Sequence, residues 1–420
     1  GTVEFIVSAD APDEFFFMEM NTRLQVEHPV TEAVLGLDLV EWQLRVAAGE
    51  PLAADLDGLV PRGHAIEARI YAEDPSAGFL PTGGTVLGLH EPAAHPGVRV
   101  DSGLAVGTEV GSHYDPMVAK VVAHGADRDD ARRRLDAALA DTAILGVTTN
   151  VAFLRELLAH PDVVDGRLDT GLVDRLVTTD ATSGSAPAAG VPAWGVAAAA
   201  GGWLTDGTDP DDPWDRRDGW TVAGRRAVAV TVEAGGAAHE VVLSTDPRTA
   251  EGWSVTVDDG PAAAVACPRP AEDDREGEDT VVVDGRRRRV RRAAAADGTC
   301  WMAHDGRTWA VRVEEPWEAH PGDRTLGHHG PVVAPMPGTV TSVVVTVGDM
   351  VGQGDPLAVV EAMKMEFTLR APFSGVVTEV HAPAGRRVAL GDPVVTVAEP
   401  DEAAADAHRG GDHHDGAEGP

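Results

Sequence analysis

The chain has 420 residues, of which 43% are hydrophobic, so it is long enough for two to four domains with cores of their own. Acidic residues outnumber basic residues 68 to 34, and the net charge of −34 argues against non-specific binding to nucleic acid or to an anionic membrane. No apolar run approaches the ~20 residues of a membrane span, nothing at the N-terminus is typical of a signal peptide, and Cys267 and Cys300 make no disulfide framework, so we expect a cytoplasmic protein.

The first residues predict strands that carry polar side chains on one face. Residues 1–4 have the pattern of a strand already under way and no initiator Met, so we expect a fragment that is truncated at its N-terminus. Residues 14–21 begin as a buried strand, and polar residues then take every second position. If the backbone stays extended until Pro29, all five project from one face: Glu19, Asn21, Arg23, Gln25 and Glu27.

Such a face suits a cation or anion site, although the residues alone favour a solvated edge strand with cross-strand ion pairs. Carboxylate and amide oxygens suit Mg²⁺, and an arginine grips a planar anion. The run FMEMNTRLQVEHPVTE at 17–32 resembles the C-terminal signature of biotin carboxylase, an ATP-grasp enzyme. The resemblance implies three groups of site residues: Glu4, Glu19 and Asn21 for Mg²⁺ (or Mn²⁺) and the ATP phosphates; Arg23, Gln25 and Val26 for bicarbonate; and Glu27 as general base.

The rest of the segment 1–178 predicts helices and one further site residue. Asp38 and Glu41 form a capping box for a helix that stops at Gly49, and two more helices are expected at 128–142 and 150–158. The run GHAIEARIYAEDP at 63–75 resembles the next strand of biotin carboxylase, which makes Arg69 the cation that stabilises the enolate of biotin. From the residues alone, Arg69 is an ion-pair partner. The runs at 79–84 and 113–120 are expected to build the biotin pocket, and the glycine-rich ATP lid of the family has no counterpart in this sequence.

A flexible linker is predicted at 179–193 and an antiparallel β-barrel-like domain at 194–320. One helix is expected at 193–204, followed by short β runs at 222–232, 239–243, 253–257, 280–283 and 309–313. The motif PWDRRDGW at 213–220 resembles the domain that links carboxylase to carrier in acyl-CoA carboxylase α subunits, which implies docking onto a carboxyltransferase subunit.

Two charged stretches have simple interpretations. The run RRRRVRR at 286–292 is a candidate nucleic-acid site, but in so acidic a chain we favour an edge strand whose charges oppose aggregation and meet an acidic partner. The tail 400–420 is predicted to be disordered, and metal binding by its histidines is the less favoured interpretation.

The segment 331–399 contains two copies of one β unit, and a lysine lies where they join. APMPGTV at 334–340 corresponds to APFSGVV at 371–377, an offset of 37 residues that also relates Gly348 to Gly385. Two such units pack as a flattened β-barrel or sandwich. Lys364 is expected at a hairpin tip, where a lysine is usually a solvating charge, but Met363 and Met365 beside it suggest recognition by a partner.

EAMKME at 361–366 in this repeat resembles the biotin carboxyl carrier domain, which implies covalent biotin on Lys364 and recognition of both methionines by biotin protein ligase. Lipoyl domains share the fold but usually lack Met on both sides of the lysine. The sequence as a whole is therefore identified as multidomain, α+β and all-β, and similar to an acyl-CoA carboxylase α subunit. That resemblance implies ATP- and bicarbonate-dependent carboxylation of biotin, a multimeric holoenzyme with a carboxyltransferase β subunit, and a role in fatty acid or branched-chain metabolism.

Other biotin enzymes remain as alternatives. The roughly 150 residues between the end modules are too few for the barrel carboxyltransferase of pyruvate carboxylase. A carrier for a membrane decarboxylase would need no biotin carboxylase segment. A lipoyl-type swinging arm is the alternative outside the carboxylases. The acyl-CoA, whether acetyl-, propionyl- or 3-methylcrotonyl-CoA, is expected to be selected by the partner subunit.

Overall fold

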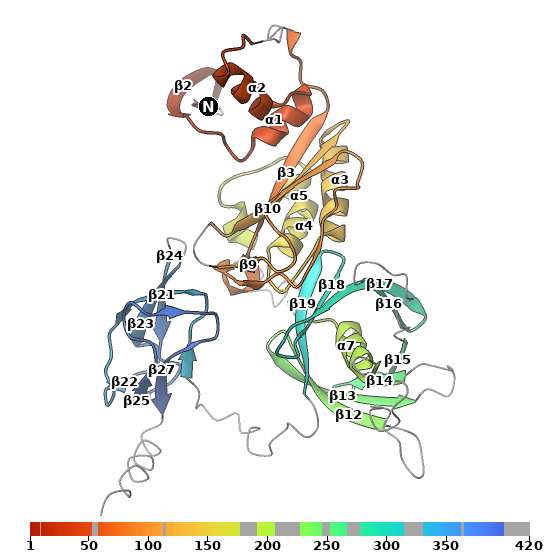
Figure 1. The fold of residues 1–420 in the computed structure, drawn as a ribbon, viewed down its shortest axis with the longest axis vertical. Helices are drawn as coiled ribbons and strands as arrows, with labels where there is room; N and C mark the ends of the chain where they lie inside the picture. Colours follow the sequence, from red (N-terminus) through yellow and green to blue (C-terminus); the bar gives the residue numbers. More distant parts are fainter. Residues whose placement is uncertain are drawn as a thin grey trace, which may run out of the picture.

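The computed structural model describes residues 1–8, 10–52, 58–111, 115–176, 191–205, 227–245, 253–266, 278–314, 331–362 and 365–398. Several predicted features lie outside these ranges: most of the linker, the 213–220 motif, Cys267, His113, Met363, Lys364 and the tail 400–420. Figure 1 shows a mixed α/β part, a β-barrel around a helix, and a β-sandwich. In the part of the chain that is described, no helix is both long and apolar enough to cross a membrane.

The chain begins with an antiparallel hairpin of β1 (Thr2–Ser8) and β2 (Ala11–Asn21). Their register places Glu4 opposite Glu19. The prediction of a buried strand is wrong for this segment, because β1 is the one described strand that pairs with β2 and both faces stay open. Phe15, Phe16 and Phe17 are all more than half exposed.

The extended backbone ends at Asn21, so the predicted alternation through Glu27 is also wrong. Residues 22–27 form a bend and a turn that lead into α1 (His28–Leu35). Pro29 lies in the first turn of α1, where its missing N–H costs nothing, and therefore starts a helix instead of ending a strand. α2 (Leu39–Ala47) follows as predicted, with the Asp38 carboxylate accepting a hydrogen bond from the Glu41 N–H at 2.7 Å.

The next part is a three-stranded antiparallel sheet of order β3-β10-β8, built from β3 (His64–Tyr71), β10 (Met117–Gly125) and β8 (Val98–Ser102). α3 (Arg128–Asp141) and α4 (Val151–Ala159) agree with the predicted helices to within one residue at each end. Fully buried Ile70, Val121, Leu135 and Leu139 form the centre of the core between sheet and helices.

Short elements complete this part. They are β4 (Glu73–Asp74) with β5 (Leu80–Pro81), β6 (Gly84–Thr85) with β9 (Glu109–Val110), β7 (Gly88–His90) with β11 (Ala143–Leu145), the 3-10 turn η2 (Pro75–Ala77) and α5 (Pro161–Val164).

The middle part is a closed antiparallel barrel of eight strands around α7 (Ala193–Thr205), as Figure 1 shows. The strands are β12 (Ala227–Ala234), β13 (Ala237–Thr245), β14 (Trp253–Val257), β15 (Ala263–Ala266), β16 (Glu278–Val283), β17 (Arg286–Ala294), β18 (Cys300–His304) and β19 (Arg307–Glu314). A helix that is apolar on all sides must be buried, and the run 196–200 of α7 is almost fully enclosed.

The barrel corrects the interpretation of the arginine run as an edge strand. β17 pairs with β16 on one side and with β18 on the other, and a closed barrel has no edge. The Arg288 side chain stacks over the ring of Trp194 from α7, with its guanidinium carbon 4.8 Å from the ring centroid.

The C-terminal part is a sandwich of two four-stranded sheets, β20-β27-β25-β22 and β24-β23-β21-β26. The strands are β20 (Pro331–Val333), β21 (Gly338–Val343), β22 (Met350–Val351), β23 (Pro356–Ala362), β24 (Met365–Arg370), β25 (Gly375–Val380), β26 (Arg387–Val388) and β27 (Pro393–Ala398). The predicted repeat is confirmed, because each sheet takes strands from both halves. β23 and β24 form the predicted hairpin with Ala362 opposite Met365.

Candidate functional site

The open end of the β1–β2 hairpin gathers four of the predicted site residues. The Asn21 amide donates hydrogen bonds to Glu4 Oε1 at 2.7 Å and to Glu19 Oε1 at 3.2 Å. Gln25 Nε2 donates to the same Glu4 oxygen at 3.1 Å. The Asn21 amide thus joins two carboxylates that repel one another, and Gln25 gives Glu4 a second donor, an arrangement that a cation would stabilise further.

Gln25 is the buried member of this group. The residue is 9% exposed, and its Oε1 has no hydrogen-bond partner among the described residues. An unmatched buried acceptor costs about 1–3 kcal/mol, so this oxygen is suited to a ligand that donates a hydrogen bond.

Glu27 lies on the other side of the same turn and contacts Arg69. The Arg69 guanidinium donates from Nη2 to Glu27 Oε2 at 2.8 Å and from Nε to Glu67 Oε1 at 3.0 Å. Burial alone would lower the pKa of Arg69, but the hydrogen bond and charge of Glu67, with the charge of Glu27, outweigh burial and raise that pKa. The prediction from the residues alone, that Arg69 is an ion-pair partner, is confirmed.

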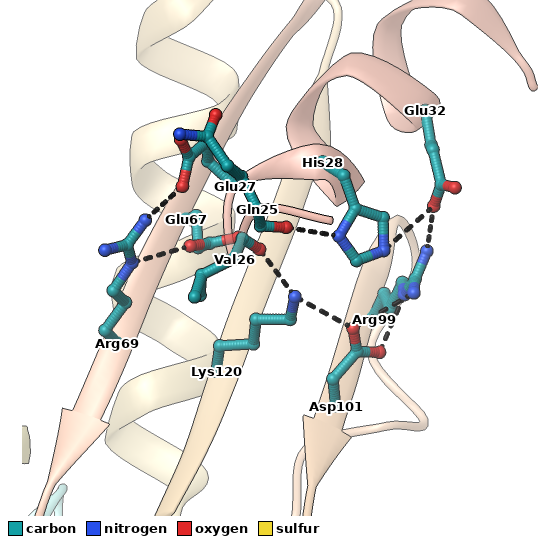
Figure 2. Close-up of polar contacts among 10 residues, drawn as sticks. All are labelled: Gln25, Val26, Glu27, His28, Glu32, Glu67, Arg69, Arg99, Asp101 and Lys120. Atoms are coloured by element: carbon teal, nitrogen blue, oxygen red, sulfur yellow. Dashed lines mark hydrogen bonds and ion pairs between the residues drawn. The ribbon is translucent and has the colours of Figure 1, made fainter. Parts of the chain in front are cut away.

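A lysine that the sequence interpretation treated as architecture holds the turn from below (Figure 2). Lys120 Nζ donates to the Val26 carbonyl at 2.6 Å and lies 3.3 Å from Asp101 Oδ2. Arg99 grips Asp101 with two nitrogens, at 2.7 and 3.0 Å, and reaches Glu32 Oε2 at 2.6 Å. A chain of alternating charges therefore links the turn to α1.

His28 holds the turn from its helical side. Its Nδ1 lies 2.8 Å from the Gln25 carbonyl, and its Nε2 is 3.9 Å from Glu32 Oε2. Arg23, which was predicted to bind bicarbonate, is exposed and makes no hydrogen bond or ion pair with the described parts of the chain. The structure thus brings Gln25, Val26 and Glu27 together and leaves Arg23 apart.

No group of three or more His, Cys, Asp or Glu side chains with the geometry of a metal site occurs in the described ranges. The predicted set for Mg²⁺ is two carboxylates and an amide, which is typical of a metal that is also held by substrate phosphates. The predicted biotin acceptor Lys364 and its neighbour Met363 lie outside the described residues, and β24 begins at Met365.

Four known families match successive parts of the chain. Residues 1–55 match the ATP binding domain of the carbamoyl-phosphate synthase L chain, and residues 67–175 match the biotin carboxylase C-terminal domain. Residues 192–316 match the BT domain of the methylcrotonyl-CoA carboxylase alpha subunit, and residues 330–397 match the family described as biotin-requiring enzyme.

Several relatives align with 88% of the chain, and two of them represent the two kinds of enzyme found. The alpha subunit of mitochondrial methylcrotonoyl-CoA carboxylase from Dictyostelium discoideum is 37% identical over 388 residues, which are 88% of this chain and 53% of that protein. The mitochondrial propionyl-CoA carboxylase alpha chain of Mus musculus is 35% identical over 394 residues, 88% of this chain and 51% of that protein. The chain thus spans about half the length of these relatives.

Among solved structures, the biotin carboxylase domain of Hydrogenobacter thermophilus 2-oxoglutarate carboxylase, in complex with MgADP, ADP and bicarbonate, is 38% identical to this chain. The alignment covers 41% of this chain and 38% of that structure, with a TM-score of 0.40.

Proposed function

We propose that this chain, a homologue of the α subunits of biotin-dependent acyl-CoA carboxylases, activates bicarbonate as part of such a subunit and carries the carboxyl group on biotin at Lys364. The observation that supports this most directly is the contact between Glu27 and Arg69, the predicted base and the predicted enolate-stabilising cation, in a chain that also matches a biotin-requiring family.

The turn at residues 25–27 provides the bicarbonate subsite in this proposal. The unpaired Gln25 Oε1 accepts the hydrogen bond of the bicarbonate hydroxyl as bicarbonate binds, and the hydroxyl turns from this oxygen to Glu27 before its proton is taken. Glu27 then takes the hydroxyl proton as a bicarbonate oxygen bonds to the γ-phosphorus of ATP, while the bond from that phosphorus to the bridging oxygen breaks and ADP leaves. A general base within hydrogen-bond reach typically contributes 10²–10⁴-fold to the rate. Arg69, released when the Glu27 carboxylate turns to bicarbonate, would be the cation that stabilises negative charge when biotin is bound beside it.

The Mg²⁺–ATP phosphates are assigned to Glu4, Glu19 and Asn21. The register of β1 and β2 supports this assignment, because both carboxylates already converge on the Asn21 amide. When bound there, a divalent cation offsets the charge that builds on the phosphates. The fit rests on the donor set, since hard oxygen ligands are those that Mg²⁺ prefers.

The partners and the compartment are proposed in the same way. The barrel docks onto a carboxyltransferase β subunit, which acts on acetyl-, propionyl- or 3-methylcrotonyl-CoA; the relatives above favour the last two. Biotin protein ligase recognises Met363 and Met365.

We keep the cytoplasm as the compartment, because the chain has only two cysteines. The names of the relatives include the word mitochondrial, so cell fractionation is the direct test.

Two variants of the complete α subunit test the proposal, each expected to lose one property and to keep the other. Glu27→Gln should abolish bicarbonate-dependent ATP cleavage and leave the streptavidin signal intact. Lys364→Arg should abolish the streptavidin signal, since a guanidinium does not form the amide, and leave ATP cleavage with free biotin intact. Lipoate instead of biotin at Lys364 by mass spectrometry, or unchanged ATP cleavage in Glu27→Gln, would refute the proposal.

A further inference from the structure

We infer that Lys120 is a positioning residue for the bicarbonate subsite: by holding the Val26 carbonyl, it sets the direction in which Glu27 presents its carboxylate. The inference rests on the proposed function of the 25–27 turn, and it adds Lys120 to the residues that shape the bicarbonate subsite.

The register of the sheet places Lys120 at the centre of a polar row. On β10 it is the direct partner of Arg69 on β3 and of Asp101 on β8. Cross-strand partners project from the same face of a sheet, so Arg69, Lys120 and Asp101 stand side by side beneath the turn. Figure 2 shows Arg69 directed at Glu27 and Lys120 directed at Val26.

The contact of Lys120 fixes a whole peptide group. The peptide that joins Val26 to Glu27 is planar, so holding the Val26 oxygen also fixes the direction of the Glu27 N–H and restrains its Cα. The adjacent Gln25 carbonyl is held by His28, so two consecutive carbonyls of the turn have side-chain partners. Glu27 itself is 52% exposed, and packing therefore does little to orient it.

Lys120 is in turn held in place by charge. Its side chain is only 10% exposed, and Asp101 compensates its ammonium group. Arg99 holds Asp101 from the far side and connects it to Glu32, which is nearly buried and also accepts from the Leu39 N–H at 2.7 Å. A buried charge with a hydrogen-bonded partner keeps a single geometry, which a positioning contact requires.

The small number of lysines in the chain also supports a specific role for Lys120. Of the 34 lysine and arginine residues in the chain, Lys120 and Lys364 are the only lysines. One of these two is the proposed biotin acceptor. A compact ammonium group can satisfy one carbonyl and one carboxylate in a narrow space, whereas a guanidinium would bring five N–H donors into it. Because nearly all other basic residues of the chain are arginines, the lysine at position 120 indicates that this narrow space requires the smaller ammonium group.

The test compares Lys120→Met with wild type in the complete α subunit. We expect the KM for bicarbonate in ATP cleavage to rise about tenfold and the KM for ATP to stay within about twofold, because only one subsite is misaligned. Lys120→Arg should restore the charge without restoring the KM for bicarbonate. Arg133→Met, which removes an exposed cation of α3 in the same part of the chain, is the matched control and should change neither constant.

If Lys120→Met folds poorly, Asp101→Asn is the second variant. It removes the negative charge that pairs with Lys120 and keeps the volume of both side chains. It should raise the KM for bicarbonate about threefold. An active wild-type subunit with an unchanged KM for bicarbonate in these variants would overturn the positioning role alone. A wild-type subunit with no bicarbonate-dependent ATP cleavage would overturn the proposed function and this inference with it.

Discussion

Asp101 is the residue on which two cations of the site converge, Arg99 from its own strand and Lys120 from the next. Burial alone would raise the pKa of Asp101, but the hydrogen bonds and charges of Arg99 and Lys120 outweigh it and hold that pKa below its ordinary value. A carboxyl group whose pKa falls on folding stabilises the native state above its ordinary pKa of about 3.9. This stabilisation is lost as the pH falls through the lower native value.

Asp101→Asn should therefore destabilise the β3-β10-β8 sheet in a pH-dependent way. At pH 7 we expect the opening free energy of the β10 amides, measured by hydrogen exchange, to fall by about 1–3 kcal/mol, the value of a hydrogen bond to a charged group. Below about pH 4 the difference from wild type should shrink, because the wild-type carboxylate becomes protonated first in the unfolded chain and, at a lower pH, in the native protein. A difference that is the same at pH 3 and at pH 7 would contradict this account.

At the scale of single residues, the sequence could indicate which polar residues lie near one another but not the backbone that positions them. Polar residues at every second position singled out Glu19, Asn21, Gln25 and Glu27, whose side chains the structure places in two neighbouring groups of hydrogen bonds, but the extended backbone assumed for them ends at Asn21. Lys120 could not be placed by pattern, since it lies 94 residues from its carbonyl partner and between apolar neighbours. The scarcity of lysine in the chain is the signal that could have identified it.

Among the elements, the two halves of the C-terminal sandwich could be predicted most fully. A constant offset of 37 residues fixes which strands correspond, and the structure places β21 and β25, and β23 and β27, at that offset. The barrel could be predicted only in outline. β15 consists of three alanines and a valine, a composition with little strand preference, and closure depends on register between strands that no local pattern shows.

Gly338 and Gly375, at equivalent positions of the two halves, offer a test of the sandwich. A Cβ on Gly338 would lie 2.6 Å from the Glu361 carbonyl oxygen, and one on Gly375 would lie 2.3 Å from the Ala398 carbonyl oxygen. Neither backbone can move without disturbing its sheet. Replacing either glycine with alanine should therefore lower the free energy of unfolding of this domain by about 1–3 kcal/mol. The change should be measurable as faster hydrogen exchange of the amides in β23 and β27.

Gly352→Ala is the control for this prediction, because its Cβ would meet only the end of the flexible Asp355 side chain, at 3.3 Å. Its exchange should match that of wild type. Equal effects of all three substitutions would mean that the loss of glycine flexibility, and not the close backbone approach, decides the stability of the sandwich.

On the scale of the whole molecule, the barrel packs against the α/β part through a small apolar contact and ion pairs around it. Ala143 and Leu145 of β11 meet Ala303 of β18. Arg307 of the barrel pairs with Glu156 of α4 at 2.6 Å, and Arg291 pairs with Asp141 at 3.3 Å. These partners are 150 residues or more apart in sequence, so the contact could not be predicted from local patterns.

Arg155 contacts both parts at once, and its removal tests whether the barrel must be held in place for bicarbonate chemistry. It donates from Nε to Asp136 at 2.8 Å and from Nη1 to the Asp305 carbonyl at 2.5 Å, in the turn between β18 and β19. Arg155→Met leaves the Asp136 and Asp305 carboxylates without this cation, so hydrogen exchange should accelerate at the turn 304–307 and in α4. The exposed Arg133→Met should not have this effect.

Bicarbonate-dependent ATP cleavage by Arg155→Met should stay within about twofold of wild type, because the network from Glu27 to Glu32 contains no barrel residue. Delivery of the carboxyl group to the partner subunit should slow instead. Once the barrel is no longer held in a fixed orientation on the α/β part, the effective concentration of the tethered biotin at the second site falls. If ATP cleavage fell as steeply as delivery, the barrel would have to be counted as part of the bicarbonate site.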